Sequence, residues 1–271
     1  MAEVRIGFVS RGDPESINMV RNLVERFQSR AGISVEPETA KKLGLAETRI
    51  EDMDVDFIVS VGGDGTILRT IRRMEDPRPI LGINMGTLGF LVDVEPKDAI
   101  RTLERVLFGF EVMERSRLST CLNGVPLPPA TNEIALLSAS PAKMLEFEII
   151  VDDSLLESLR ADGLLFATST GSTAYAMSAG GPIVDPRVDA VVLVPLAPFK
   201  LSARPWVLPA ESVIKVDLDL PEKEALVVID GHNVATISKK DHITISRAET
   251  PARFVKAREG GFYEKVKSKL A

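Results

Sequence analysis

Short apolar runs recur along the first hundred residues and predict buried strands. Three of them are almost wholly apolar, and they cover residues 4–10, 56–61 and 79–84. Runs of this length, bounded by glycine or proline, are typical of strands that lie inside a folded domain.

The stretches between these runs repeat apolar residues at helical spacing. Pro14 opens the first helix, residues 66–74 are expected to form the second, and Pro96 suits the first turn of a third. The apolar stripes of the first and third helices are Ile17, Val20, Leu23, Val24 and Phe27, and Ile100, Leu103, Val106 and Leu107. Strands alternating with helices predict an α/β domain with a doubly wound, mostly parallel sheet covered by helices.

The pattern changes after about residue 109, where helical spacing almost disappears. Short strand-like segments follow one another at residues 144–153, 212–220, 225–230 and 242–247. This pattern predicts an all-β second domain, similar to a β-sandwich. We therefore expect an α/β domain at 1–109, a β-rich domain at 110–250, and a segment at 251–271 that packs back on the first domain.

Composition restricts the classes of function. The chain has 271 residues and a net charge of −6, which argues against a general nucleic-acid binder. Cys121 is the only cysteine and there are two histidines, so neither an intrachain disulfide nor a typical zinc site is expected. The apolar run at 190–199 is too short to span a bilayer. We expect a cytoplasmic protein that binds neither membranes nor nucleic acid.

A glycine-rich stretch, Gly62-Gly63-Asp64-Gly65-Thr66, joins the second predicted strand to the helix after it. No lysine follows these glycines, which excludes a Walker-type loop, and Leu68 replaces the third glycine of a dinucleotide fingerprint. Amide groups at such a junction can still approach an oxyanion. The aspartate would then act as a base toward a hydroxyl or hold Mg²⁺ against phosphates. An Asp-Gly turn without function is the alternative for these residues.

Three longer segments resemble one family in its own order along the chain. The loop at 62–66 is similar to the phosphate loop of NAD kinases, of diacylglycerol and sphingosine kinases, and more loosely of 6-phosphofructokinases. The segments "TNEIAL" (131–136) and "ADGLLFATSTGSTAYAMSAGGPIV" (161–184) resemble NAD kinases specifically, as do "GINMGTLGFL" (82–91) and "DGH" (230–232). Ser169 departs from the family, which usually has proline there, and His232 stands where many members have glutamine.

The resemblance implies a role for each matched residue. Asp64 would be the base for the 2′-hydroxyl of the adenosine ribose, and Arg160 and Lys143 would be local cations. The remaining implied substrate contacts are Gly62, Gly63, Gly65 and Thr66 for phosphates, Asn132 and Glu133 for NAD, and Asp162, Thr173, Ala174, Tyr175, Ser178 and His232 for the rest of the dinucleotide. No residue is assigned as a metal ligand, and Mg²⁺ or another divalent cation would come with ATP.

The implied reaction is that of an NAD kinase. A phosphoryl group would pass from ATP, another nucleoside triphosphate or polyphosphate to NAD, giving NADP. The resemblance also implies a homo-oligomer, either a dimer or a tetramer. A lipid kinase of the same superfamily and a non-catalytic dinucleotide-binding sensor are the alternatives. The polar stretches at 132–133 and 173–178 argue against the first, and Asp64 argues against the second.

Overall fold

The structure, a computed structural model, describes residues 4–86, 89–140, 143–219, 224–237, 241–257 and 261–270. The chain divides into two compact units, Met1–Glu114 with Ala252–Ala271 (unit 1) and Arg115–Pro251 (unit 2). Residues 87 and 88 of the matched segment 82–91, and residue 220 of a predicted strand, lie outside the described residues. Within the described ranges, no helix is long and apolar enough to cross a membrane.

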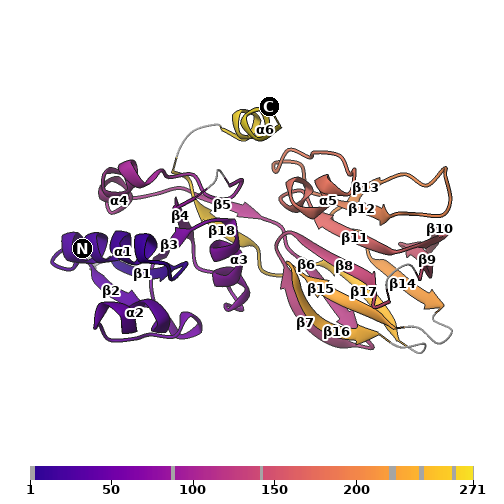
Figure 1. Cartoon of the computed structure of the whole chain (residues 1–271), viewed down its shortest axis with the longest axis horizontal. Helices are drawn as coiled ribbons and strands as arrows, with labels where there is room; N and C mark the ends of the chain where they lie inside the picture. Colours follow the sequence, from indigo (N-terminus) through magenta and orange to yellow (C-terminus); the bar gives the residue numbers. More distant parts are fainter. Residues whose placement is uncertain are drawn as a thin grey trace. The chain divides into compact units, whose positions relative to one another are not determined.

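Unit 1 contains a six-stranded sheet with the order β2-β1-β3-β4-β18-β5. Its strands are β1 (Arg5–Ser10), β2 (Gly32–Val35), β3 (Phe57–Gly62), β4 (Ile80–Asn84), β5 (Val112–Arg115) and β18 (Ala252–Val255). β1 pairs in parallel with β2 and β3, and β4 pairs in parallel with β3 and β18. Figure 1 shows β18, from the end of the chain, beside β4. The predicted doubly wound sheet is confirmed.

The helices of unit 1 include all three that the sequence predicted. They are α1 (Pro14–Phe27), α2 (Pro37–Leu43), α3 (Asp64–Arg72), α4 (Ala99–Val106) and α6 (Phe262–Leu270), with short 3-10 turns η1 (Ile50–Asp52) and η2 (Pro96–Asp98). Asp13 caps α1 by accepting the Ser16 N–H at 3.1 Å, and the whole predicted apolar stripe of α1 is buried. Ile100 differs from its prediction, because it is 42% exposed. Leu103 and Val106 of the same predicted stripe are buried, together with Ala99.

Several elements of unit 1 were not predicted, among them β2 and α2. Both are short, and β2 is only partly buried apart from Val35. The position of β2 matters for the site. In the sheet, β2 lies on one side of β1, and the next strand along the chain, β3, lies on the other side. The sheet order therefore reverses between β1 and β3. In open α/β sheets, ligands bind outside the carboxyl ends of the strands at this reversal.

Unit 2 consists of two antiparallel sheets packed face to face. Their orders are β10-β9-β14-β17-β6-β7 and β13-β12-β11-β8-β15-β16. The strands are β6 (Leu118–Leu122), β7 (Val125–Ala130), β8 (Glu133–Ser138), β9 (Leu145–Val151), β10 (Ser154–Ala161), β11 (Gly163–Thr168), β12 (Ala190–Leu196), β13 (Trp206–Pro209), β14 (Ile214–Asp219), β15 (Ala225–Ile229), β16 (His232–Ile237) and β17 (His242–Arg247). Phe147 of the first sheet and Phe166 of the second belong to one buried core. The expected β-rich fold is confirmed, with η3 (Gly171–Thr173) and α5 (Tyr175–Ser178) as its short helical turns.

Candidate active site

The glycine-rich loop lies at the carboxyl end of β3, beside the reversal of strand order. Gly63 has an extended backbone, and α3 begins immediately after it at Asp64, two residues earlier than predicted. The N–H of Thr66 is bonded to the Gly63 carbonyl at 3.0 Å. The N–H groups of Asp64 and Gly65 donate to no acceptor in the described part of the chain. Two backbone donors at a helix start are thus available to an anion.

The three glycines of this loop differ in the space around them, and so in the reason that each position needs glycine. A Cβ on Gly62 would collide with the side chain of Thr66, so the packing of the protein itself requires glycine there. At Gly63 and Gly65, an added Cβ would meet no atom of a described residue within 4 Å. Internal packing does not explain these two glycines. Glycine at these two positions leaves room for a ligand to approach the backbone closely.

The carboxylate of Asp64 is bound by the backbone of a neighbouring segment. It accepts the N–H of Phe90 on Oδ2 at 2.7 Å, and the N–H groups of Leu91 and Val92 on Oδ1 at 3.0 and 3.2 Å. The sequence analysis did not anticipate these bonds. From the described residues, Oδ2 accepts one hydrogen bond, and a carboxylate oxygen can accept two. Oδ2 is therefore the atom of Asp64 that can accept a further proton or hydroxyl.

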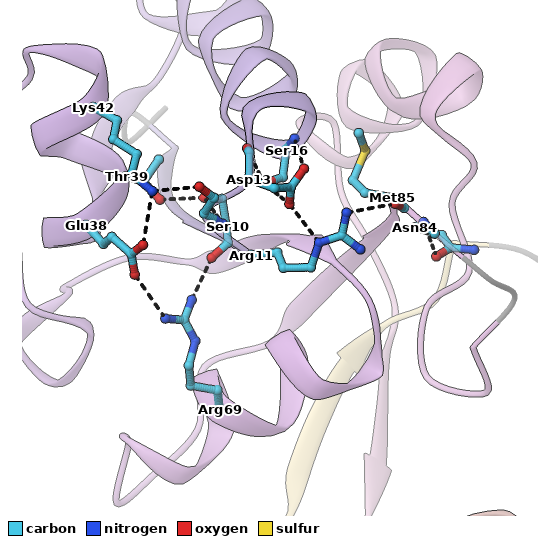
Figure 2. A network of polar contacts seen from close by, with 12 residues as sticks. Ser10, Arg11, Asp13, Ser16, Glu38, Thr39, Lys42, Arg69, Asn84 and Met85 are labelled. Atoms are coloured by element: carbon cyan, nitrogen blue, oxygen red, sulfur yellow. Dashed lines mark hydrogen bonds and ion pairs between the residues drawn. The ribbon is translucent and has the colours of Figure 1, made fainter.

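A polar network joins the ends of the strands around this loop (Figure 2). Arg11 follows β1 and donates from Nε to Asp13 at 2.7 Å and from a terminal nitrogen to the Met85 carbonyl at 3.1 Å, beyond the end of β4. The Arg11 guanidinium holds the pKa of Asp13 well below its usual range. Sequence reasoning missed Arg11. A cation directly after the first strand is the signal that would have found it.

The same network fixes the backbone between β1 and α1. Arg69 of α3 donates to the Ser10 carbonyl at 2.6 Å, and Lys42 of α2 donates to the Gly12 carbonyl at 2.6 Å. The hydroxyls of Ser10 and Thr39 are 2.7 Å apart in the buried part of the network. Figure 2 shows these side chains converging on the segment from Ser10 to Asp13. The backbone beside the glycine loop is therefore held from two helices.

In unit 2, Asp230 shapes the matched segment that begins at residue 131. Its carboxylate accepts the N–H groups of Thr131 at 2.8 Å, Asn132 at 2.7 Å and Glu133 at 3.1 Å. Asp230 and Gly231 both have positive φ, 45° and 79°, in a tight turn between β15 and β16. Sequence reasoning noted this Asp-Gly pair only as part of the resemblance. The carboxylate of Asp230 binds three backbone N–H groups that lie 97 to 99 positions away in the sequence, and local patterns do not indicate such contacts.

Glu133 is a buried acid of the site whose pKa is raised. Its residue is 8% exposed, and its Oε2 has no hydrogen-bond partner in the described residues. The backbone N–H of Tyr175 bonds to the carboxylate. Burial, and secondly the negative charge of Asp230, raises the pKa of Glu133 from 4.5 to about 7. A buried polar atom without a partner, in a group with a shifted pKa, is typical of a binding site.

The structure brings part of the third matched segment against Asn132 and Glu133. The carbonyl of Asn132 accepts the N–H of Thr168 at 2.9 Å, and Gly171 packs so closely on the Asn132 backbone that a Cβ there would collide with it. Tyr175 begins α5 with its residue 45% exposed, and the turn before it contains Thr173 and Ala174. Asn132, Glu133 and Tyr175 thus form one cluster.

Other predicted site residues lie outside this cluster in the structure. Arg160 is on β10, with its guanidinium over the Phe199 ring at 5.5 Å, and Lys143 is exposed ahead of β9. Asp162 lies between β10 and β11, and its N–H bonds to the Leu196 carbonyl at 3.0 Å. His232 is exposed, with Nδ1 at 3.0 Å from the Asp230 carbonyl oxygen. Ser178 is the last residue of α5. Their roles stay predictions.

Comparison with known proteins points to one family over most of the chain. Residues 6–109 match the model of the ATP-NAD kinase N-terminal domain, and residues 131–257 match that of the ATP-NAD kinase C-terminal domain. The NAD kinase of Methanosarcina mazei is 55% identical over 275 residues, which cover 100% of this chain and 95% of that protein. The NAD kinase of Methanothermobacter thermautotrophicus is 45% identical over 273 residues, covering 98% and 96%.

Solved structures show the same likeness. An NAD kinase from Archaeoglobus fulgidus in complex with ATP has a TM-score of 0.82 at 34% identity, covering 98% of this chain and 99% of that chain. Yeast NADH kinase complexed with NADH has a TM-score of 0.92 at 24% identity, covering 99% of this chain and 87% of that chain. The yeast enzyme shares the fold.

Proposed function

The chain belongs to the NAD kinase family, and we propose that it transfers a phosphoryl group from ATP to the 2′-hydroxyl of the adenosine ribose of NAD. The observation that carries the proposal is the glycine loop. It combines two available N–H groups, open space above Gly63 and Gly65, and a carboxylate at the start of α3. The lipid-kinase alternative is not favoured, because the matched models and relatives are NAD kinases.

The donor phosphates are proposed to bind at the start of α3. The N–H groups of Asp64 and Gly65 point out of the helix start, where the helix dipole also favours negative charge. Gly62 and Thr66 support this turn by packing on each other, as the collision of a Cβ at Gly62 indicates. Polyphosphate would fit the same donors, since they recognise phosphate and not a base.

A divalent cation such as Mg²⁺ is proposed to bind with the nucleotide. The described residues contain no group of three or more acidic, histidine or cysteine side chains that would hold a metal ion. Mg²⁺ usually keeps several waters and binds largely through substrate phosphates, so the nucleotide would bring the cation with it. When bound, the cation would neutralise charge on the phosphates.

Asp64 is the proposed base. The 2′-oxygen of NAD forms a bond to the γ-phosphorus as the bond to the β,γ-bridging oxygen breaks, and ADP leaves. The hydroxyl proton goes to Oδ2 of Asp64, the carboxylate oxygen that accepts one hydrogen bond from the described residues. The backbone N–H groups of Phe90, Leu91 and Val92 hold the carboxylate in a fixed orientation. The carboxylate is therefore already ordered before NAD binds, and the reaction does not have to supply the entropy cost of orienting it.

The acceptor is proposed to bind to residues of unit 2. Glu133, with its unpartnered buried oxygen, and Asn132 would bind hydroxyls and amide groups of NAD, and Tyr175 would offer an aromatic face. Because the pKa of Glu133 is about 7, this side chain can donate as well as accept a hydrogen bond at neutral pH. The further proposed contacts of NAD are Lys143, Arg160, Asp162, Thr173, Ala174, Ser178 and His232.

We also propose a cytoplasmic homo-oligomer, either a dimer or a tetramer. The single cysteine supports a reducing compartment, because no intrachain disulfide is possible. Large apolar residues around the edge strand β13 support self-association. They are Phe199 (69% exposed), Leu201 (93%), Trp206 (41%) and Val207 (53%).

The activity is tested by mixing the purified protein with NAD, ATP and Mg²⁺ and following NADP with an NADP-specific dehydrogenase. Parallel reactions replace ATP with polyphosphate, or NAD with diacylglycerol. NADP is expected with NAD and ATP, and an Asp64→Asn preparation controls for contaminating kinases. Phosphorylated diacylglycerol without NADP would overturn the proposal. Tight NAD binding without turnover would instead indicate the non-catalytic sensor.

A further inference from the structure

The backbone segment that binds Asp64 is also held from its other side. Its N–H groups at Phe90, Leu91 and Val92 point to the Asp64 carboxylate. Two of its carbonyl groups point to Lys265 of α6, whose ammonium donates to the Phe90 oxygen at 2.9 Å and to the Val92 oxygen at 3.1 Å. A basic residue 201 positions along the chain from Asp64 thus contacts the same short segment.

One peptide group connects the two charged residues directly. The carbonyl of Phe90 and the N–H of Leu91 belong to the same peptide bond, and the described chain has no cis peptide bonds. The oxygen of this group accepts from Lys265, and its N–H donates to Asp64 Oδ1. The cation and the anion each align this peptide dipole in the same sense. Hydrogen bonds in such a chain strengthen one another in a partly buried setting.

The surrounding packing leaves this segment little freedom. A Cβ at Gly89 would collide with Asp64 Oδ1, so the backbone lies directly on the carboxylate. On the other side, Lys269 of α6 lies over the Phe90 ring at 4.2 Å from its centroid. Lys265 also pairs with Asp93, and its side chain is only 15% exposed. A partly buried ammonium with three acceptors is a well-fixed group.

We propose that Lys265 is a positioning residue for Asp64, acting through the peptide group between Phe90 and Leu91. By fixing the carbonyls of the segment, Lys265 fixes the N–H groups that orient the Asp64 carboxylate toward the reacting hydroxyl. The effect belongs to the chemical step, because Lys265 contacts neither the N–H groups of the glycine loop nor the cluster of Asn132, Glu133 and Tyr175 in the described residues. This inference rests on the proposed role of Asp64.

The test compares Lys265→Met with Lys267→Met in the full chain. Lys267 lies on the same helix, is exposed, and makes no hydrogen bond or ion pair with the described residues, so it controls for loss of charge. In Lys265→Met, kcat should fall about tenfold to a hundredfold, the usual result of misplacing a reacting group. The dissociation constants of NAD and ATP should change less than about threefold, since only the reacting group is displaced. Lys265→Arg, which keeps a charged donor, should recover most of kcat.

A second readout follows the link without reference to activity. Amide hydrogen exchange at Leu91 should accelerate at least about tenfold in Lys265→Met and stay as in the unmodified protein in Lys267→Met. Unchanged exchange at Leu91 would overturn the link, and faster exchange with unchanged kcat would overturn the positioning role. If Lys265→Met does not fold, kcat and exchange at Leu91 are measured in Lys265→Gln, which keeps N–H donors but has no charge. Failure of the proposed function is distinct, because the unmodified protein would then form no NADP, and failure of the proposed role of Asp64 would leave turnover in Asp64→Asn.

Discussion

The carboxylate of Asp230 binds the backbone of Glu133 and also disfavours the negative charge of the Glu133 side chain. The Asp230 carboxylate accepts the backbone N–H of Glu133 at 3.1 Å, which helps to fix the loop that presents Glu133. The negative charge of Asp230 also raises the pKa of the Glu133 side chain, although burial is the larger cause. The carboxylate that orders this loop therefore adds to the effect of burial, and together they keep Glu133 partly protonated near neutral pH.

We predict that Glu133→Gln stabilises the protein more at pH 8 than at pH 5. The pKa of Glu133 is raised from 4.5 to about 7 in the folded state, so the folded state binds more protons than the unfolded state between these values. The free energy of unfolding therefore falls as the pH rises through this window, by up to about 3 kcal/mol in total. Glutamine cannot ionise and removes this loss. Thermal unfolding of both proteins at each pH measures the difference.

The matched control for this prediction is Glu148→Gln, an acid on the exposed face of β9. Its substitution should change stability equally at both pH values. A Glu133→Gln variant whose gain in stability does not depend on pH would show that Glu133 is already charged in the folded protein at pH 5. Its unpartnered Oε2 would then have to be solvated.

We predict that Asp64→Asn abolishes turnover and leaves NAD binding intact. General-base catalysis is typically worth about 10²–10⁴ in rate. The structure adds a second consequence, because the asparagine NH₂ cannot accept the N–H bonds that one carboxylate oxygen accepts now. Thermal stability should therefore fall as well, by about 1–3 kcal/mol for the donors left without an acceptor. Steady-state kinetics, calorimetry with NAD and thermal unfolding separate the three effects.

A rate loss below about tenfold with normal NAD affinity would reject Asp64 as the base. Asp52→Asn serves as the comparison, since Asp52 is an exposed acid at the end of η1 and does not contact the Asp64 carboxylate among the described bonds. This variant should retain most of the turnover.

Local patterns predicted much of the fold and pointed to the glycine loop. The stripe of α1, its start at Pro14 and the all-β character of unit 2 follow from spacing and composition, and the structure confirms them. The supports of the site do not follow from local patterns. Asp230 contacts residues 97 to 99 positions away, and Arg11 reaches Met85 across 74 positions. Such pairs depend on the sheet order, which single-sequence periodicity does not specify.

We predict that Gly65→Ala weakens ATP binding while the protein becomes no less stable. A Cβ at Gly65 meets no described atom within 4 Å, and alanine in place of glycine inside a helix is worth about 1 kcal/mol in stability. The added methyl would occupy the space proposed for donor phosphates. Gly62→Ala gives the opposite pattern, because its Cβ would collide with Thr66 and the melting temperature should fall. Unchanged ATP affinity in Gly65→Ala would show that phosphates do not approach this backbone.

Tyr175→Ala should weaken NAD binding and leave ATP affinity nearly unchanged. The residue is 45% exposed, so removing the ring should cost little stability. Its backbone N–H, which counters part of the rise in the pKa of Glu133, is kept in the variant, so the change reports on the ring. Stacking of a base on an aromatic side chain is worth about 1–3 kcal/mol, which corresponds to a loss of affinity of about five- to a hundredfold. Tyr175→Phe keeps the ring and should bind NAD nearly as well as the unmodified protein. Titration of each ligand separately by calorimetry tests the assignment. A selective loss of ATP affinity would place Tyr175 on the donor side and reject its proposed contact with NAD.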